Sequence, residues 1–162
     1  MTVLEMRRMV NKELLNYCVS KERLIAFRQR GLRQRSTCGR ASLAPGKDPT
    51  SGAALAYLEP PSAIRKSQAW VWAIEQAYES LKCCSPERAR LMVRLYGLDG
   101  KLPALERRGW RVHLMEEFNI SEPSLYRWRT DIQQAVLAGA VQAGVLSPYP
   151  VKDMPGGSVV GI

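Results

Sequence analysis

The chain has 162 residues, which is enough for one ordinary domain or for a small domain with an extension. Hydrophobic residues make up 46% of it, which supports a packed core and argues against a wholly disordered chain. The formal net charge is +9, and residues 1–40 carry ten Lys and Arg against three Asp and Glu. This excess predicts an anionic partner, either nucleic acid or a membrane surface, and charge alone does not choose between them.

Two general features predict a protein of the cytoplasm. The sequence has no uninterrupted run of about 18 apolar residues, and its start, MTVLEMRRMVNKELL, lacks the apolar stretch of a secretory signal. We therefore expect no membrane partner. The cysteines show no CxxC spacing, so we expect them to be reduced and to pack in the interior, without a metal or redox role; they are Cys18, Cys38, Cys83 and Cys84.

The first predicted element is helical and covers residues 2–30. Its apolar residues recur in steps of three and four, as on one side of a helix, and they include Val3, Val10, Leu14, Tyr17, Cys18, Leu24, Ile25, Phe27 and Met6. The pattern lapses near Ser20, which leaves open one helix with a weak point or two helices. Such a segment could form a homodimer or pack on its own chain. We define residues 1–35 as a basic, amphipathic helical segment.

The next part, residues 36–61, is rich in Gly, Pro, Ser and Thr and is predicted to be a linker. It contains no Gly-rich loop with the spacing of a phosphate-binding loop, and we expect no cofactor. A helix follows Pro60-Pro61, and we expect Trp70 and Trp72 to lie in its core or in an interface. The apolar side of this helix is formed by Ile64, Val71, Ile74, Tyr78 and Leu81.

Ser85-Pro86-Glu87 is typical of a helix start, and this helix should bury Ala89, Met92, Leu95 and Tyr96 before GLDGK ends it. Another helix should begin near Leu102 or Pro103, and a last one should run from Glu122 to about Gly144. Residues 147–162 have the Pro and Gly content of a disordered tail. No strand alternation is visible, so we predict an all-α fold with one helical domain at 62–146.

The segment EEFNISEPSLYRWRT predicts a helix-turn-helix at about residues 111–130. Asn119 stands at the turn position that requires a left-handed backbone, Ser121 can cap the second helix, and Pro123 fits its first turn. Met115 is the one deviation, because a small residue is commoner there. The expected motif core is formed by Leu114, Phe118, Asn119, Ile120, Leu125 and Trp128.

The outer side of the second helix should then contact DNA. Arg can pair with guanine, Ser and Thr with bases or phosphates, and Glu122 could accept from cytosine. The residues expected at the bases or in the groove are Ser121, Glu122, Ser124, Tyr126, Arg127 and Thr130. Arginines around the motif should contact phosphates, namely Arg107, Arg108, Arg111 and Arg129. The one histidine, His113, has no nucleophile beside it, so we predict no catalytic residue and no metal site.

ISEPSLYRWRTDI, preceded by RLMVRLYGLDG, resembles the C-terminal part of the ArpU/RinA group of phage late-gene transcriptional regulators. KELLNYCVSKERL, DPTSGAALAYLE and AWVWAIEQAYESL are similar to that family's N-terminal helix, linker and central helix. The resemblance covers roughly residues 1–145, and the GLDGKLPALERRGWRVHL stretch is longer than in that family. It implies a motif like region four of bacterial sigma factors and an activator of phage late genes in a bacterial cytoplasm.

We therefore expect a sequence-specific DNA-binding regulator that acts on double-stranded DNA and recruits RNA polymerase, with the N-terminal helices dimerising or contacting the polymerase. It should not be an enzyme. The first alternative is a phage small terminase subunit, which also joins a helix-turn-helix to oligomerising helices. The second is a helical protein-interaction module without DNA binding.

Overall fold

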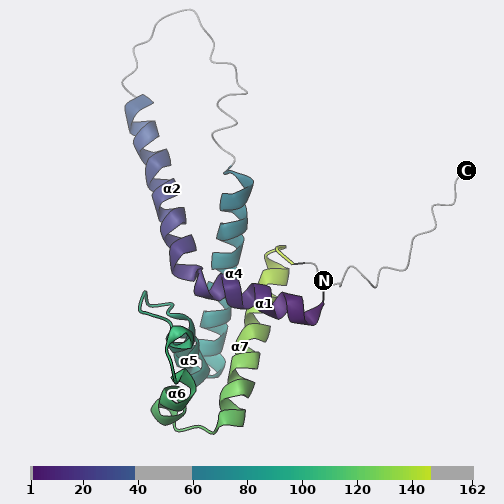
Figure 1. Cartoon of the computed structure of the whole chain (residues 1–162). Helices are drawn as coiled ribbons and strands as arrows, with labels where there is room; N and C mark the ends of the chain where they lie inside the picture. Colours follow the sequence, from purple (N-terminus) through teal and green to yellow (C-terminus); the bar gives the residue numbers. More distant parts are fainter. Residues whose placement is uncertain (1, 39–59, 147–162) are drawn as a thin grey trace, which may run out of the picture.

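The computed structural model describes residues 2–38 and 60–146, and over these ranges the chain is all-α (Figure 1). The predicted linker falls mostly, and the predicted tail wholly, outside the described residues. Within them there are six α-helices, one 3-10 turn and no strand, so the predicted fold class is confirmed. The elements are α1 (Val3–Leu15), α2 (Tyr17–Cys38), α4 (Ser62–Cys84), α5 (Pro86–Tyr96), η1 (Ala104–Glu106), α6 (Trp110–Phe118) and α7 (Glu122–Gln142).

Helix α4 lies at the centre and packs against α2, α5 and α7 (Figure 1). Its apolar side buries Val71, Ile74 and Leu81, as its spacing predicts, and Trp70 beside them is buried as well. The contact with α7 is close at Gly139, where an added Cβ would stand 2.8 Å from the carbonyl oxygen of Ala73. Because only a glycine permits this approach, the two helices pack backbone to backbone at that point.

The N-terminal segment forms two helices that break at Asn16, four residues before the point where the apolar pattern lapses. Helix α1 begins with a capping box between Thr2 and Glu5 and packs across α7. It is fastened there by Asn11, whose Oδ1 accepts hydrogen bonds from Tyr96 Oη and Gln133 Nε2, both at 2.9 Å. In this structure the segment therefore packs on its own chain.

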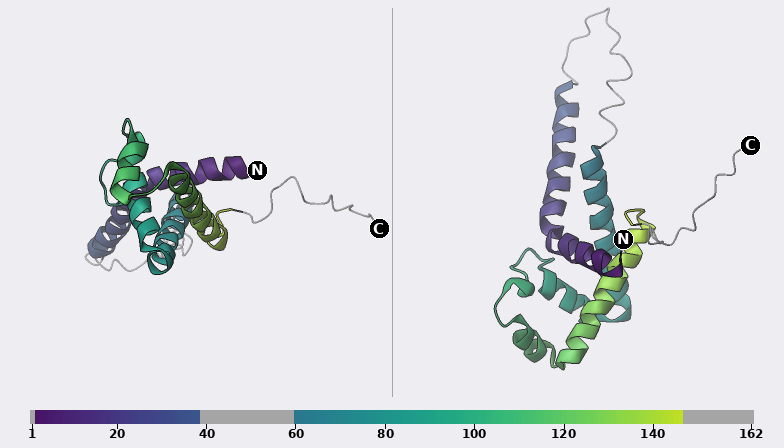
Figure 2. Two further views of the ribbon diagram at one scale, coloured as in Figure 1. Left: turned by 90° about the horizontal axis from the view of Figure 1, so that it is seen from below. Right: turned by 45° about the vertical axis from the view of Figure 1, so that its right-hand side comes forward.

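Helices α2 and α4 lie side by side and extend beyond the other helices (Figures 1 and 2). Their lower parts are joined by Lys21 Nζ, which lies 2.9 Å from Glu75 Oε1, and by Tyr17 Oη, which donates to the same oxygen. We call the upper part, residues 22–38 of α2 and 62–69 of α4, the α2–α4 arm. Leu24 is its one buried residue among the side chains described there.

Several apolar residues and two of the cysteines are exposed in this chain. Val3, Ile25, Phe27 and Trp72 are 62%, 47%, 38% and 41% exposed, because no neighbouring helix covers their sides of α1, α2 and α4. Of the cysteines whose side chains are described, Cys83 and Cys84 are exposed and do not pack in the interior. Cys18 does pack: it is half-buried, and its thiol donates to the carbonyl of Gly97 at 3.2 Å.

The helix predicted from Leu102 or Pro103 is also shorter than expected. Residues 104–106 form a 3-10 turn, and Gly109 at φ 72° interrupts the backbone before α6 begins at Trp110. A left-handed residue cannot continue a right-handed helix, so the extended stretch before the motif is mostly loop. Across residues 2–38 and 60–146, no helix is long and apolar enough to cross a membrane.

Candidate nucleic-acid interface

The turn between α6 and α7 consists of Asn119, Ile120 and Ser121. Asn119 has φ 51° and ψ 49°, and it is the only non-glycine residue with positive φ in the described parts of the chain. The amide of Ile120 donates to the carbonyl of Met115 at 3.1 Å, which closes the end of α6. The predicted left-handed turn residue is thus confirmed, and the chain passes from α6 into α7 within three residues.

Side chains predicted as the motif core meet at this turn. Leu114 on α6 and Leu125 on α7 are 1% and 0% exposed, and Ile120 is half-buried between their helices. The rings of Phe118 and Trp128 meet edge to face, with centroids 6.5 Å apart at 83°, a favoured aromatic geometry. Because both helices contribute to one apolar cluster, the angle between α6 and α7 is held by packing.

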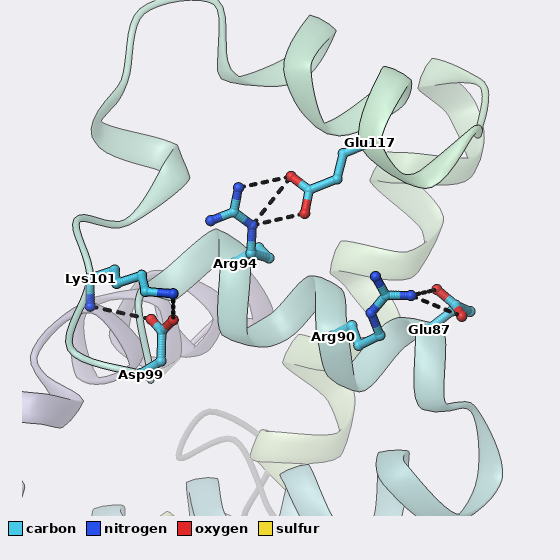
Figure 3. A network of polar contacts seen from close by, with 6 residues as sticks. All are labelled: Glu87, Arg90, Arg94, Asp99, Lys101 and Glu117. Atoms are coloured by element: carbon cyan, nitrogen blue, oxygen red, sulfur yellow. Dashed lines mark hydrogen bonds and ion pairs between the residues drawn. The ribbon is translucent and has the colours of Figure 1, made fainter.

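Helix α5 braces the turn through two ion pairs that periodicity could not predict. Arg94 makes a bidentate contact with Glu117 of α6, with Nε and Nη2 each 2.9 Å from a carboxylate oxygen (Figure 3). Arg88 contacts Asp131 of α7 at 3.1 Å. The hydrogen bonds from Arg94 lower the pKa of the Glu117 carboxyl, which therefore favours its charged form.

Tyr126 and Arg127, on the outer side of α7, both face solvent. Tyr126 is 40% exposed, and Arg127 is exposed without an ion pair among the described residues. Thr130 Oγ1 donates to the carbonyl of Tyr126 at 3.0 Å, so its hydroxyl hydrogen is held on the helix backbone. Tyr126 and Arg127 are therefore the α7 residues best placed to contact an external ligand.

The start of α7 differs in detail from the sequence prediction. Ser121 occupies the N-cap position, but its side chain makes no capping hydrogen bond and instead pairs with Ser124 Oγ at 3.0 Å. Glu122 is exposed and forms an ion pair with Arg111 of α6, with Nη1 3.3 Å from Oε1. Glu122 and Arg111 partly neutralise each other across the entrance to α7, so each would have to leave its partner to contact DNA fully.

Apart from Arg111, the arginines expected to contact phosphates divide into two groups. Arg107 and Arg108 are exposed and border a hollow of about 400 Å³ between η1, α5 and α6, which His113 also lines. Arg129 is half-buried: its guanidinium lies 5.9 Å from the Trp110 ring, and its Nε is buried without a hydrogen-bond partner within the described part of the chain. Its outward reach is thus smaller than that of Arg107 and Arg108.

A metal site or a known relative would be another guide to function. No group of three or more His, Cys, Asp or Glu residues that could hold a metal ion occurs in the ranges the structure describes. Comparisons of the chain with protein-family models, with curated proteins and with solved structures find no match. The functional proposal below therefore rests on the exposed side chains around α6 and α7.

Proposed function

We propose that this protein is a sequence-specific DNA-binding transcriptional regulator and that α6 and α7 form its helix-turn-helix. The carrying observation is the pairing of a packed left-handed turn at Asn119 with an outward face of α7 that presents Tyr126 and Arg127. In such a motif the second helix enters the major groove, and its N-terminal half contacts base edges.

The charge distribution supports specific roles for the side chains. Arg127 can pair bidentately with guanine, and Tyr126 can contact a thymine methyl or a phosphate. Arg107 and Arg108, just before α6, would contact the backbone beside the groove and contribute salt-sensitive affinity. The protein would act by recruiting RNA polymerase and not by catalysis. Its resemblance to phage late-gene regulators favours activation of phage late genes.

Two variants test this proposal after DNA fragments from the source genome have been selected on the protein. Arg127→Ala should cost about 1–3 kcal/mol of binding to the selected site and should relax the sequence preference. Arg108→Ala should weaken binding to all duplexes alike and reduce the slope of log K against log salt by about one. Lys82→Ala, at an exposed position near the end of α4, is the control. Unchanged site binding by Arg127→Ala would exclude the groove assignment.

A second candidate is a phage small terminase subunit, which recognises DNA for packaging. The observation that favours it is the α2–α4 arm, where Ile25 and Phe27 remain 47% and 38% exposed and could pack against other copies. A ring of eight or more chains in light scattering would support this candidate, whereas a monomer or a homodimer would support the regulator. A helical protein-interaction module without DNA binding would show no salt-dependent affinity for any duplex.

A further inference from the structure

The α2–α4 arm is the most one-sidedly charged part of the described chain, and the proposed function does not use it. Over residues 22–31 and 62–69 it carries five basic side chains and one acidic side chain, Glu22. All five basic side chains are exposed; they are Arg23, Arg28, Arg30, Arg65 and Lys66. A net surplus of four charges over so short a segment attracts a polyanion.

Two of these side chains form a strip on α2. Arg23 and Arg30 are seven residues apart, which is about two helical turns and a rise of roughly 10 Å, so they lie on the same side of the helix. Ala26 and Phe27 lie between them on that side of α2, and both are exposed. No ion pair in the described part of the chain involves Arg23 or Arg30, so neither has to release an internal partner on binding.

The strip differs in this respect from its neighbours Lys21 and Arg28. Lys21 is paired with Glu75, and the charge of Arg28 contributes to the lowered pKa of that same carboxyl. These two side chains therefore help to hold α2 on α4. Arg23 and Arg30 have no comparable structural role, which makes them the side chains on the arm best suited to an external anion.

The arm lies at the opposite end of the molecule from the α6–α7 turn (Figures 1 and 2). Arg65 and Lys66 lie near the start of α4, whose 23 residues span about 35 Å at 1.5 Å per residue, whereas Arg23 closely follows Lys21, which pairs with Glu75, nine residues or about 14 Å from the end of α4 next to α5. Both distances exceed the screening length of about 8 Å at physiological salt, so the arm adds little to the binding of phosphates held at α6 and α7. A second DNA segment can therefore occupy the arm.

We propose that the α2–α4 arm binds the phosphate backbone of a second DNA segment, without sequence preference, while α6 and α7 hold the specific site. Guanidinium groups suit phosphates because they donate two parallel hydrogen bonds. A membrane surface fits less well. Ile25 and Phe27 are two residues apart and project about 200° from each other around α2, so the exposed apolar side chains form no continuous face to insert into lipid.

The test is a bridging assay with the full chain. A bead-bound duplex carrying the selected site captures the protein, and a labelled duplex of unrelated sequence is then added. The double variant Arg23→Ala with Arg30→Ala should capture at least about fivefold less labelled duplex at low salt. The salt slope of that capture should fall by about 1.8, because each phosphate that is no longer neutralised lowers it by about 0.9. Binding to the bead-bound site should stay within about twofold.

The matched control is Arg8→Ala with Lys12→Ala, which removes the same charge from exposed positions on α1. It should leave bridging unchanged. Equal losses in the two double variants, or full bridging by the arm variant, would overturn the proposal. A lower mass of the arm variant in sedimentation velocity would also overturn it, because the arm would then be an interface between copies.

Two further measurements distinguish this proposal from a lipid partner and from the proposed function itself. Arm-dependent binding to vesicles of phosphatidylcholine with about one-third phosphatidylserine, without bridging of DNA, would assign the arm to a lipid surface and refute the proposal. The proposal rests on the proposed function only in taking DNA as the polyanion. If Arg127→Ala leaves site binding intact while the arm variant still loses its second duplex, the groove assignment fails and the arm assignment stands.

Discussion

The α6–α7 turn and the α2–α4 arm are both built from paired helices, yet they are held in different ways. At the turn Leu114 and Leu125 are 1% and 0% exposed, and α5 adds two ion pairs from outside. In the arm Leu24, at 6%, is the one buried residue among the side chains described. Sequence-specific contacts require a fixed helix angle, whereas contacts with a phosphate backbone do not. The firmly packed α6–α7 turn is therefore suited to sequence-specific recognition of DNA. The thinly packed α2–α4 arm is suited to unspecific binding of phosphates.

The largest expected effect comes from truncating a buried side chain between α6 and α7. Leu125→Ala should destabilise the protein by about 2–5 kcal/mol, because Leu125 is fully buried and its truncation leaves a cavity between α6 and α7. Urea unfolding followed by circular dichroism measures this change. Leu102→Ala, at a side chain that is 57% exposed, should stay within about 0.5 kcal/mol of the parent. Equal effects at the two positions would show that the turn is not packed as described.

Alanine substitutions at two helical glycines, one in the contact of α4 with α7 and one in the arm, compare the packing of these two regions more directly. Gly139→Ala should destabilise by about 1–3 kcal/mol, because its methyl group would stand 2.8 Å from the Ala73 carbonyl oxygen. Gly31→Ala, in the arm, meets nothing within 4 Å and should stabilise α2 by about 0.5–1 kcal/mol. Since both changes gain similar helix propensity, the difference between the two unfolding free energies reports the close approach of α4 and α7. A difference near zero would contradict that contact.

A structural feature could be predicted from the sequence when the residues that determine it lie close together along the chain. The turn at Asn119 and the burial of Leu114 and Leu125 follow from local offsets along two adjacent helices, and the structure agrees with them. The core positions of α5 and α4 follow from the same periodicity. The local spacing of apolar, turn and helix-start residues was therefore enough to predict the position of the candidate interface, but it does not identify the ligand.

Features that depend on distant partners could not be predicted. Arg94 and Glu117 are 23 residues apart, and nothing in their spacing identifies them as a pair. Apolar residues at helical spacing, such as Val3 and Ile25, look like core until the packing of the neighbouring helices is known. The late start of α6 was missed because Gly109 interrupts a stretch whose other residues favour helix.

The next effect in size concerns the backbone of the turn itself. Asn119→Ala should cost about 1–2 kcal/mol, because a Cβ without a local hydrogen-bonding group disfavours the left-handed conformation at φ 51°. Asn119→Gly should be close to neutral, because glycine adopts positive φ readily. Thermal unfolding of the two variants side by side gives the comparison. Equal stability of the alanine and glycine variants would mean that the turn tolerates another backbone.

The smallest expected effect is electrostatic and depends on pH. The Glu117 carboxyl has a pKa lowered by its hydrogen bonds with Arg94, so it ionises more readily in the folded chain than in the unfolded chain. Its contribution is therefore complete above the unfolded pKa of about 4.3 and is lost as the pH falls through the lower folded value. Since both side chains are partly exposed, the pair should contribute less than about 1 kcal/mol. Glu117→Gln should be less stable than the parent at pH 7, and the difference should shrink toward pH 3.

Glu87→Gln, in the more exposed pair with Arg90, is the matched control and should change less at pH 7. A difference for Glu117→Gln that persists unchanged at low pH would place the cause in packing and not in the charge of the bridge between α5 and α6.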